Sequence, residues 1–315
     1  MKNDIAFRWL GVCGIELTCG KTRILIDPYF TRLKAHFLWI GRPESDVRTI
    51  RKHIHGADHI FITHSHFDHL LDVADIVFMT GAVAHGSPNT IELLRRKGVP
   101  SSHLRLIQPN EPDHFGPFEI EALEAVLHSP PGYGPGKLPG EYRLPLKAAD
   151  YVMDTVMAFR IRAAGVNMLF EHCLRPVEAL PVDILFLEPY AGLKRSSHAQ
   201  YTRILNDFRP RLVIPVHADD MMMSLDQPVV GQILPQRHIV PLARFNFQLF
   251  KKTIESVRPQ TKVFLPNRLE VYELRAKLSR LAERESVFPS LTSLRINILR
   301  IASRSLALIR RQLGY

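Results

Sequence analysis

The sequence predicts a layered domain of the α+β class. The order of its strands and helices also fits the related α/β class. Short apolar or alternating runs, bounded by glycine and proline, recur through the first 220 residues. They form two blocks of strands, each followed by a segment with helical spacing. The 315 residues are 46% hydrophobic and 23% charged, which is ordinary for a globular chain with a substantial core. We therefore expect a main domain over residues 1–245.

The first block opens the chain. Its strands alternate or run apolar, and Gly11, Gly14 and Gly20 mark the turns between them. Strands are predicted over residues 6–12, 15–19, 22–30 and 57–63. The spacing of apolar residues predicts one helix over 47–54, before the last of these strands.

The second block mixes strands with two helices. A helix over 89–98 is predicted to begin at Asn89 and to end at Gly98. A second helix is expected over 197–208. Strands are predicted over residues 103–108, 118–129, 158–165, 167–173, 183–189 and 211–218. The stretch 129–150 is rich in proline and glycine, which is typical of a binding loop or lid, or of a plain surface insertion.

Residues 246–315 are predicted to form a helical C-terminal extension. Residues 267–286 have helical spacing with mixed charges, and residues 288–315 contain five arginines and no acidic residue. One face of this last segment is apolar, formed by Leu291, Leu294, Ile298, Ala302, Ser305 and Ile309. Such a basic amphipathic helix can lie on an anionic bilayer. The alternative is that its apolar stripe packs on the main domain or on a second subunit as a homo-oligomer.

The strand over 57–63 leads directly into a dense group of polar side chains. His64, His66 and Asp68 alternate, and alternate side chains of an extended segment point the same way. His69 follows where the chain can turn into a helix, so it aims at a neighbouring point. Neutral imidazole and carboxylate are natural ligands of zinc, iron and manganese. This loop therefore predicts a metal site with as many as four ligands.

The H-x-H-x-D-H pattern of this loop resembles the signature of the metallo-β-lactamase superfamily. The resemblance covers most of residues 5–220, including an Ile-Asp-Pro turn after the opening strands and strands that end near His128 and His217. It implies a four-layer αββα sandwich with metals at one edge, between the two sheets. It also implies a first metal held by His64, His66 and His128, and a second held by Asp68, His69 and His217. The opening strands are most similar to the lactonase-like and N-acyl phosphatidylethanolamine phospholipase D-like branches.

One position departs from the family pattern. The family has a Gly-Asp pair whose aspartate bridges both metals, and the strand end "NMLFEHCLRP" has none. Cys173 falls nearest to that place, and a thiolate binds zinc well. Three interpretations stay open: Cys173 is the ligand, Glu171 or His172 takes its place, or nothing bridges and the second site is weak or empty.

Asp27, in the Ile-Asp-Pro turn, has two interpretations of its own. It orients a ligand histidine from behind, or it forms an Asx turn before Pro28.

The chemistry implied by the resemblance is hydrolysis. Zinc, as one or two ions, with manganese or iron as alternatives, would lower the pKa of bound water and stabilise the developing oxyanion. Asp68 would orient the resulting hydroxide and pass a proton to the leaving group. The expected substrate is an ester, lactone, amide, thioester or phosphoester. Alternative functions are a ribonuclease Z-like nuclease, an iron-dependent redox enzyme, and a membrane-docked scaffold without catalysis.

Charge and cysteine content narrow the partners and the compartment. The net charge of +10 and the pI near 9.7 suit an acidic small-molecule or lipid-like substrate, an anionic membrane surface or nucleic acid. Because no strip of interleaved basic and aromatic residues is present, a nucleic-acid partner is not expected. Three cysteines and an N-terminus without a long apolar run favour the cytoplasm, with the inner membrane surface as a peripheral location.

Overall fold

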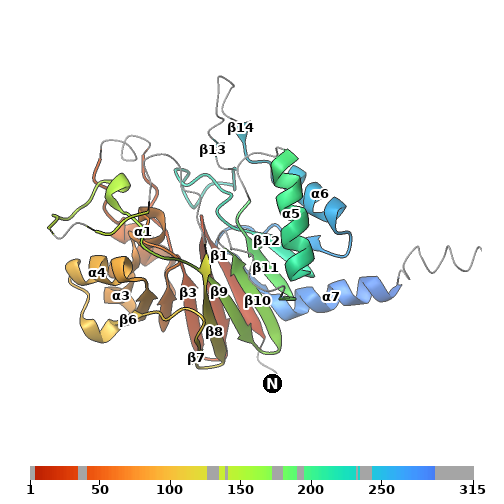
Figure 1. Cartoon of the computed structure of the whole chain (residues 1–315), viewed down its shortest axis with the longest axis horizontal. Helices are drawn as coiled ribbons and strands as arrows, with labels where there is room; N and C mark the ends of the chain where they lie inside the picture. Colours follow the sequence, from red (N-terminus) through yellow and green to blue (C-terminus); the bar gives the residue numbers. More distant parts are fainter. Residues whose placement is uncertain are drawn as a thin grey trace, which may run out of the picture. The chain divides into compact units, whose positions relative to one another are not determined.

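The structure is a computed structural model that divides into two compact units, residues 1–274 and residues 275–315. It describes residues 4–34, 41–125, 135–138, 141–171, 180–189, 195–231, 233–234 and 243–287. The first unit contains two sheets with helices on their outer faces (Figure 1). The second unit is described only over the greater part of α7 (Leu274–Val287).

The first sheet contains seven strands among the described residues, in the order β16-β1-β2-β3-β4-β5-β6. Its strands are β1 (Ile5–Gly11), β2 (Gly14–Cys19), β3 (Thr22–Ile26), β4 (His59–Phe61), β5 (Val83–Gly86), β6 (Leu104–Leu106) and β16 (Val271–Glu273). From β16 to β3 neighbouring strands are antiparallel, and from β3 to β6 they are parallel. The parallel half brings the carboxyl ends of β3 and β4 to one edge, where ligands of open α/β sheets bind.

The second sheet has the order β15-β12-β11-β10-β9-β8-β7, and it repeats this division into antiparallel and parallel halves. Its strands are β7 (Pro112–Phe115), β8 (Phe118–Ala125), β9 (Val156–Ala163), β10 (Val166–Glu171), β11 (Ile184–Leu187), β12 (Leu212–Pro215) and β15 (Lys262–Val263). A separate pair is formed by β13 (Ile233–Leu234) and β14 (Ala243–Arg244).

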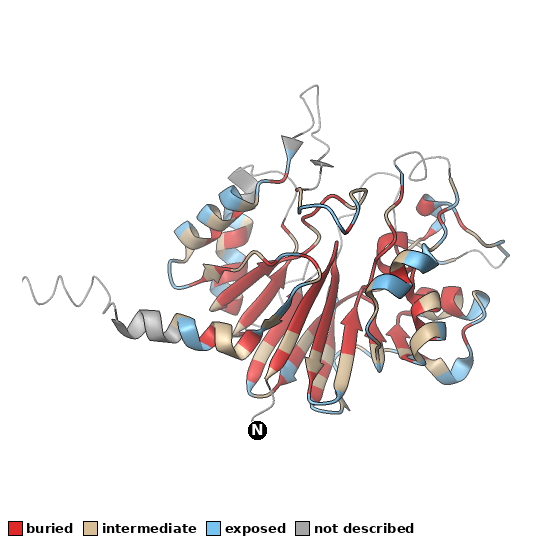
Figure 2. Ribbon diagram, turned by 180° about the vertical axis from the view of Figure 1, so that it is seen from behind, coloured by how far each residue is buried: buried red, intermediate tan, exposed pale blue. Residues whose placement is uncertain are grey.

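Each sheet has its own apolar layer on its outer face. Helices α1 (Val47–His53), α2 (Phe67–Leu70), α3 (Val73–Thr80) and α4 (Pro88–Arg96) contribute to a cluster with the first sheet. Helices α5 (Arg195–Phe208) and α6 (Phe247–Val257) pack on the second sheet in another cluster. The strands are red over much of their length in Figure 2 because their residues are buried. Burial on both faces explains why several strands are continuous apolar runs rather than alternating ones.

The two sheets also contact each other directly. The ring centroids of Phe7 and Phe186 are 5.4 Å apart, and those of Phe61 and Phe159 are 5.7 Å apart. Beyond the carboxyl end of β4, the N–H of Met157 in β9 donates to the carbonyl of Thr63 (2.9 Å). The two-sheet sandwich that the resemblance implied is therefore confirmed.

Individual elements differ from the sequence prediction in ways that have physical reasons. The helix predicted to begin at Asn89 begins one residue earlier, because Ser87 caps α4 through Thr90 N–H and Pro88 takes the first helical position. Strands β5 (VAHG) and β7 (PDHF) were not predicted, because each is short and has too few apolar residues to show a continuous or an alternating apolar pattern. The first unit continues to residue 274, beyond the predicted boundary at 245, because β15 pairs with β12 and β16 pairs with β1.

Candidate metal centre

The histidine-rich loop joins β4 to α2 at the edge where the parallel strands end. His66 has extended backbone (φ −65°, ψ 154°) and immediately precedes α2, so Asp68 and His69 lie in the first turn of the helix. The four predicted ligands in this loop, His64, His66, Asp68 and His69, are all buried, and Nε2 of His64 lies 2.9 Å from Nδ1 of His66. Histidine and aspartate are rarely buried together without partners, so this loop is built for a specific polar role.

Asp27 holds the loop from the carboxyl end of β3. Its carboxylate accepts hydrogen bonds from the N–H of Thr63 (2.8 Å) and from the Thr63 hydroxyl (2.6 Å). The same carboxylate accepts from Nδ1 of His69 (2.8 Å). Because a carboxylate only accepts, His69 carries a proton on Nδ1, and in the neutral ring Nε2 is the nitrogen with the lone pair.

His217 enters the cluster from the second sheet, just after β12. It is 149 residues from Asp68 in sequence, yet its Nε2 lies 3.1 Å from Oδ2 of Asp68. Its ring stacks on that of His69 with centroids 5.6 Å apart. The backbone at His217 is left-handed (φ 55°), and its N–H donates to the carbonyl of Val12 (2.7 Å).

Glu188, which the sequence analysis did not single out, adds a second carboxylate on the same side. It follows β11, and its Oε1 is 3.5 Å from Nδ1 of His217. Burial alone would lower the pKa of His217, but Glu188 and Asp68 outweigh it and raise that pKa to about 10. Carboxylates at this edge therefore favour positive charge at the position of His217.

Two residues of the histidine-rich loop, His66 and Asp68, have pKa values that are shifted downward. Burial lowers the pKa of His66 to about 4, which keeps its imidazole neutral. Burial would raise the pKa of Asp68, but His69 and His217 hold it well below its usual value, so Asp68 is a carboxylate. Neutral imidazole and ionised carboxylate are the forms that bind a cation.

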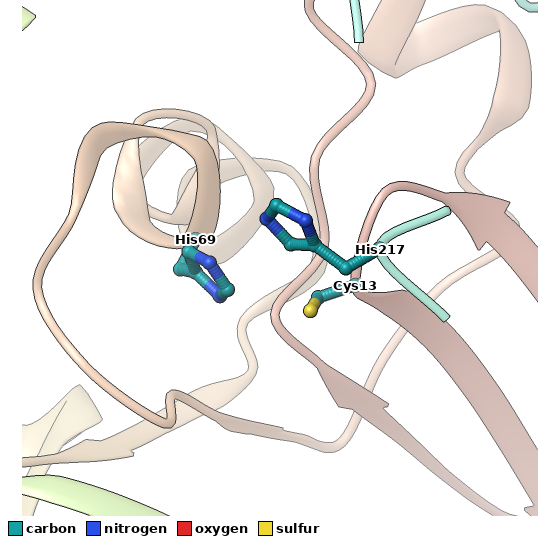
Figure 3. Close-up of side chains that lie close together, drawn as sticks. All are labelled: Cys13, His69 and His217. Carbon is teal, nitrogen blue, oxygen red and sulfur yellow. The ribbon is translucent and has the colours of Figure 1, made fainter. Parts of the chain in front are cut away.

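Cys13, in the turn between β1 and β2, is the other residue that the sequence analysis missed. Its sulfur and one ring nitrogen each of His69 and His217 all lie within 4.8 Å of one another. Figure 3 shows the three side chains, which come from separate segments, directed into one space. The signal available in the sequence was the Gly11–Gly14 turn, whose glycines let the backbone turn tightly beside the loop.

Several predicted ligands lie outside the described residues. His128, His172 and Cys173 are among them, and β8 ends at Ala125, before His128. Glu171 is the last residue of β10, and its side chain is not described. The described residues therefore bring together His64, His66, Asp68, His69 and His217 from the predicted set.

The class of protein follows from this geometry and from a family model. The model described as "Beta-lactamase superfamily domain" matches residues 22–218, which include β3, the histidine-rich loop and His217. Two sheets with a histidine and aspartate cluster at their shared edge define a protein of the metallo-β-lactamase class.

Similarity to known proteins identifies the family of the chain within this class. It is 36% identical over 226 residues to a UPF0173 metal-dependent hydrolase of Pyrobaculum islandicum, covering 70% of this chain and 87% of that protein. The chain therefore belongs to the UPF0173 metal-dependent hydrolase family of the metallo-β-lactamase superfamily.

Solved structures agree on the fold. Igni18, a metallo hydrolase from Ignicoccus hospitalis, is 17% identical, with a TM-score of 0.56 over 85% of this chain and 97% of that chain. CmlA, a diiron β-hydroxylase from Streptomyces venezuelae, is 15% identical, with a TM-score of 0.50 over 86% of this chain and 54% of that chain. Within the described part of the chain, no helix is long and apolar enough to cross a membrane.

Proposed function

We propose that this metal-dependent hydrolase cleaves an ester, a lactone or a phosphoester of a small or lipid-like acidic molecule. The observation that carries the proposal is the convergence of His217 on Asp68 across the two sheets (3.1 Å). Residues from two distant segments meet at one buried point, which packing alone does not require. Proposed ligands are His64, His66, Asp68, His69 and His217, with His128 and Cys173 as further members of the set.

The donor set fits one or two divalent cations. Imidazole nitrogens suit zinc, iron and related metals, and a carboxylate between them adds the charge that neutralises the cation. Asp27 and Asp68 are buried, Glu188 is half-buried, and each of the three carboxylates lies beside a histidine at this edge, so a bound cation would be balanced by nearby negative charge. We propose zinc, with manganese or iron as alternatives.

When bound, such a cation lowers the pKa of a water molecule and stabilises the oxyanion that develops on the substrate. Asp68 lies in the first turn of α2, where it accepts a hydrogen bond from His217. An ionised carboxylate there accepts a proton from the attacking water and returns it to the leaving group. Asp27 keeps His69 in one tautomer and one orientation (Nδ1 to Oδ2, 2.8 Å).

The acidic character of the substrate follows from charge. A net charge of +10 attracts anions to the surface. The similarity of the opening strands to lactonase-like and N-acyl phosphatidylethanolamine phospholipase D-like enzymes favours lactones and phosphodiesters within this group. Fold and donor set alone do not choose between them.

The test combines metal analysis with a substrate panel. Purified wild-type protein, His66→Ala and His198→Ala are compared for metal content and for turnover of lactone, carboxylic ester and phosphodiester substrates. His198 is an exposed histidine on α5 and serves as the matched control. We expect His66→Ala to lose metal and turnover and His198→Ala to keep both. Full metal content in His66→Ala would contradict the proposed ligand set.

A further inference from the structure

We propose that Cys13 is a thiolate ligand of the second cation, together with His69 and His217. The inference rests on the proposed metal centre and adds a donor from a third segment of the chain. The sulfur of Cys13 and the nearest ring nitrogens of the two histidines lie within 4.8 Å of one another. The Cys13 side chain is fully buried, so the sulfur faces the protein interior rather than solvent.

The turn that carries Cys13 is held in place by the same segment that carries His217. The N–H of His217 donates to the carbonyl of Val12 (2.7 Å), and the N–H of Val12 donates to Asp219 (2.7 Å). The indole N–H of Trp9 also donates to the carbonyl of Val12 (3.0 Å). The position of Cys13 relative to His217 is therefore set by two hydrogen bonds between the segments, and the bond from Trp9 holds the turn itself.

Asp219 and Gly14 show how closely these segments approach. Asp219 is buried between two arginines, with Arg268 at 3.2 Å and Arg32 at 3.9 Å. A β-carbon added to Gly14 would lie 3.2 Å from the carbonyl oxygen of Asp27. The turn, the His217 segment and the Asp27 segment thus meet around one point.

The donor chemistry indicates the kind of cation. Two imidazoles and a thiolate form a soft nitrogen and sulfur set, which selects zinc, iron(II) or cobalt(II) over magnesium or calcium. A cation bound by these donors would displace the proton of the Cys13 thiol, because the thiolate is the form that ligates a metal.

This assignment changes the interpretation of the missing Gly-Asp pair. The sequence pointed to Cys173 as the nearest replacement, and that residue lies outside the described structure. Cys13 supplies a thiolate to the same group of histidines from the opposite end of the domain sequence. The competing interpretation is that Cys13 only fills a small space in a tight turn.

The chain contains only three cysteines, Cys13, Cys19 and Cys173, so the assignment can be tested by replacing each of them in turn. Cys19 is the matched control, because it is also buried but lies at the far end of β2 from the turn. Cobalt(II) is loaded into the full-length wild-type, Cys13→Ser, Cys19→Ser and Cys173→Ser proteins, with cobalt content measured for each.

We expect a thiolate-to-cobalt charge-transfer band in the near ultraviolet whose intensity per bound cobalt falls in Cys13→Ser and is unchanged in Cys19→Ser, while Cys173→Ser retains the share that comes from Cys13. An undiminished band in Cys13→Ser overturns the inference, and so does its absence from wild-type protein that holds cobalt. Wild-type protein that binds no cobalt and no zinc would overturn the proposed function itself.

A second measurement does not depend on the folding of Cys13→Ser. In the double variant Cys19→Ser/Cys173→Ser, Cys13 is the one cysteine that remains. X-ray absorption at the zinc edge of this loaded variant should show a sulfur neighbour with the short distance of a thiolate. A zinc shell that contains only nitrogen and oxygen overturns the inference.

Discussion

Nδ1 of His69 lies 2.8 Å from Oδ2 of Asp27, and the same carboxylate accepts two hydrogen bonds from Thr63. One residue at the end of β3 therefore sets both the start of the histidine-rich loop and the orientation of a ring within it. The buried carboxylate also balances any positive charge that His69 acquires. Of the two interpretations of Asp27, orientation of a histidine is the one with a direct contact in the structure.

Replacing Asp27 with asparagine should weaken metal binding without removing a proposed ligand. We expect the affinity to fall by about 10- to 100-fold, because His69 loses the acceptor that holds its tautomer. Competition with a chelator measures the change. Asp58→Asn is the control, since Asp58 is exposed and its carboxylate accepts a hydrogen bond from the N–H of Arg23 rather than from a histidine. Equal affinities in the two variants would contradict the role of Asp27.

Local sequence predicted the loop because its residues are contiguous. His64, His66, Asp68 and His69 follow a short strand directly, so the period of an extended segment was enough to group them. His217 was assigned only through resemblance to a family, because its contact with Asp68 spans 149 residues. The α+β class was likewise predictable from strand and helix periodicity.

Cys13 and Glu188 were not predictable by the same means. Cys13 reaches the site through the hydrogen bonds of Val12 with His217 and Asp219, which join opposite ends of the domain sequence. Glu188 follows an apolar strand with nothing near it in sequence to mark it as a site residue. The short strands β15 and β16 were missed for a related reason, because partners far away in sequence determine them.

Asp72 should contribute strongly to stability while lying outside the proposed ligand set. It is fully buried and accepts from the N–H groups of Phe30 (2.6 Å) and Thr31 (2.8 Å) and from the Thr31 hydroxyl (2.6 Å). Asp72→Ala leaves three donors without this acceptor, which should cost about 2–4 kcal/mol of unfolding free energy. Urea unfolding of metal-free protein measures the cost.

The control for Asp72 lies one turn along the same helix. Asp75 is half-buried in α3, and Asp75→Ala should cost about 1 kcal/mol or less. A similar loss of stability in both variants would show that the buried hydrogen bonds of Asp72 are not the cause.

The C-terminal segment carries the prediction of membrane contact. Residues 288–315 lie outside the described structure, and their five arginines without an acidic residue predict binding to anionic bilayers. Co-sedimentation with phosphatidylglycerol vesicles should be lost when residues 286–315 are deleted. Phosphatidylcholine vesicles are the control, and neither protein should bind them. Undiminished binding by the deletion variant would place the contact elsewhere.

His85 should make the fold sensitive to acid. Burial, followed by His59 and Arg105, lowers the pKa of His85 to about 3, and the ring stacks on Phe61 with centroids 4.6 Å apart. In the unfolded chain its pKa is about 6.5. Between pH 3 and pH 6.5 the His85 ring is therefore protonated in the unfolded chain and neutral in the folded protein. The resulting stabilisation is complete above pH 6.5 and is lost as the pH falls toward 3.

The size of the effect follows from the two pKa values. Protonation of His85 in the unfolded chain should lower the free energy of unfolding by about 2 kcal/mol at pH 5 relative to pH 7.5. Because glutamine does not titrate, the His85→Gln variant should lose about 2 kcal/mol less free energy of unfolding than the wild type between pH 7.5 and pH 5. Urea unfolding of both proteins in a chelator, at the two pH values, separates this effect from metal release. If the two proteins lose the same free energy between pH 7.5 and pH 5, His85 is not the group that titrates.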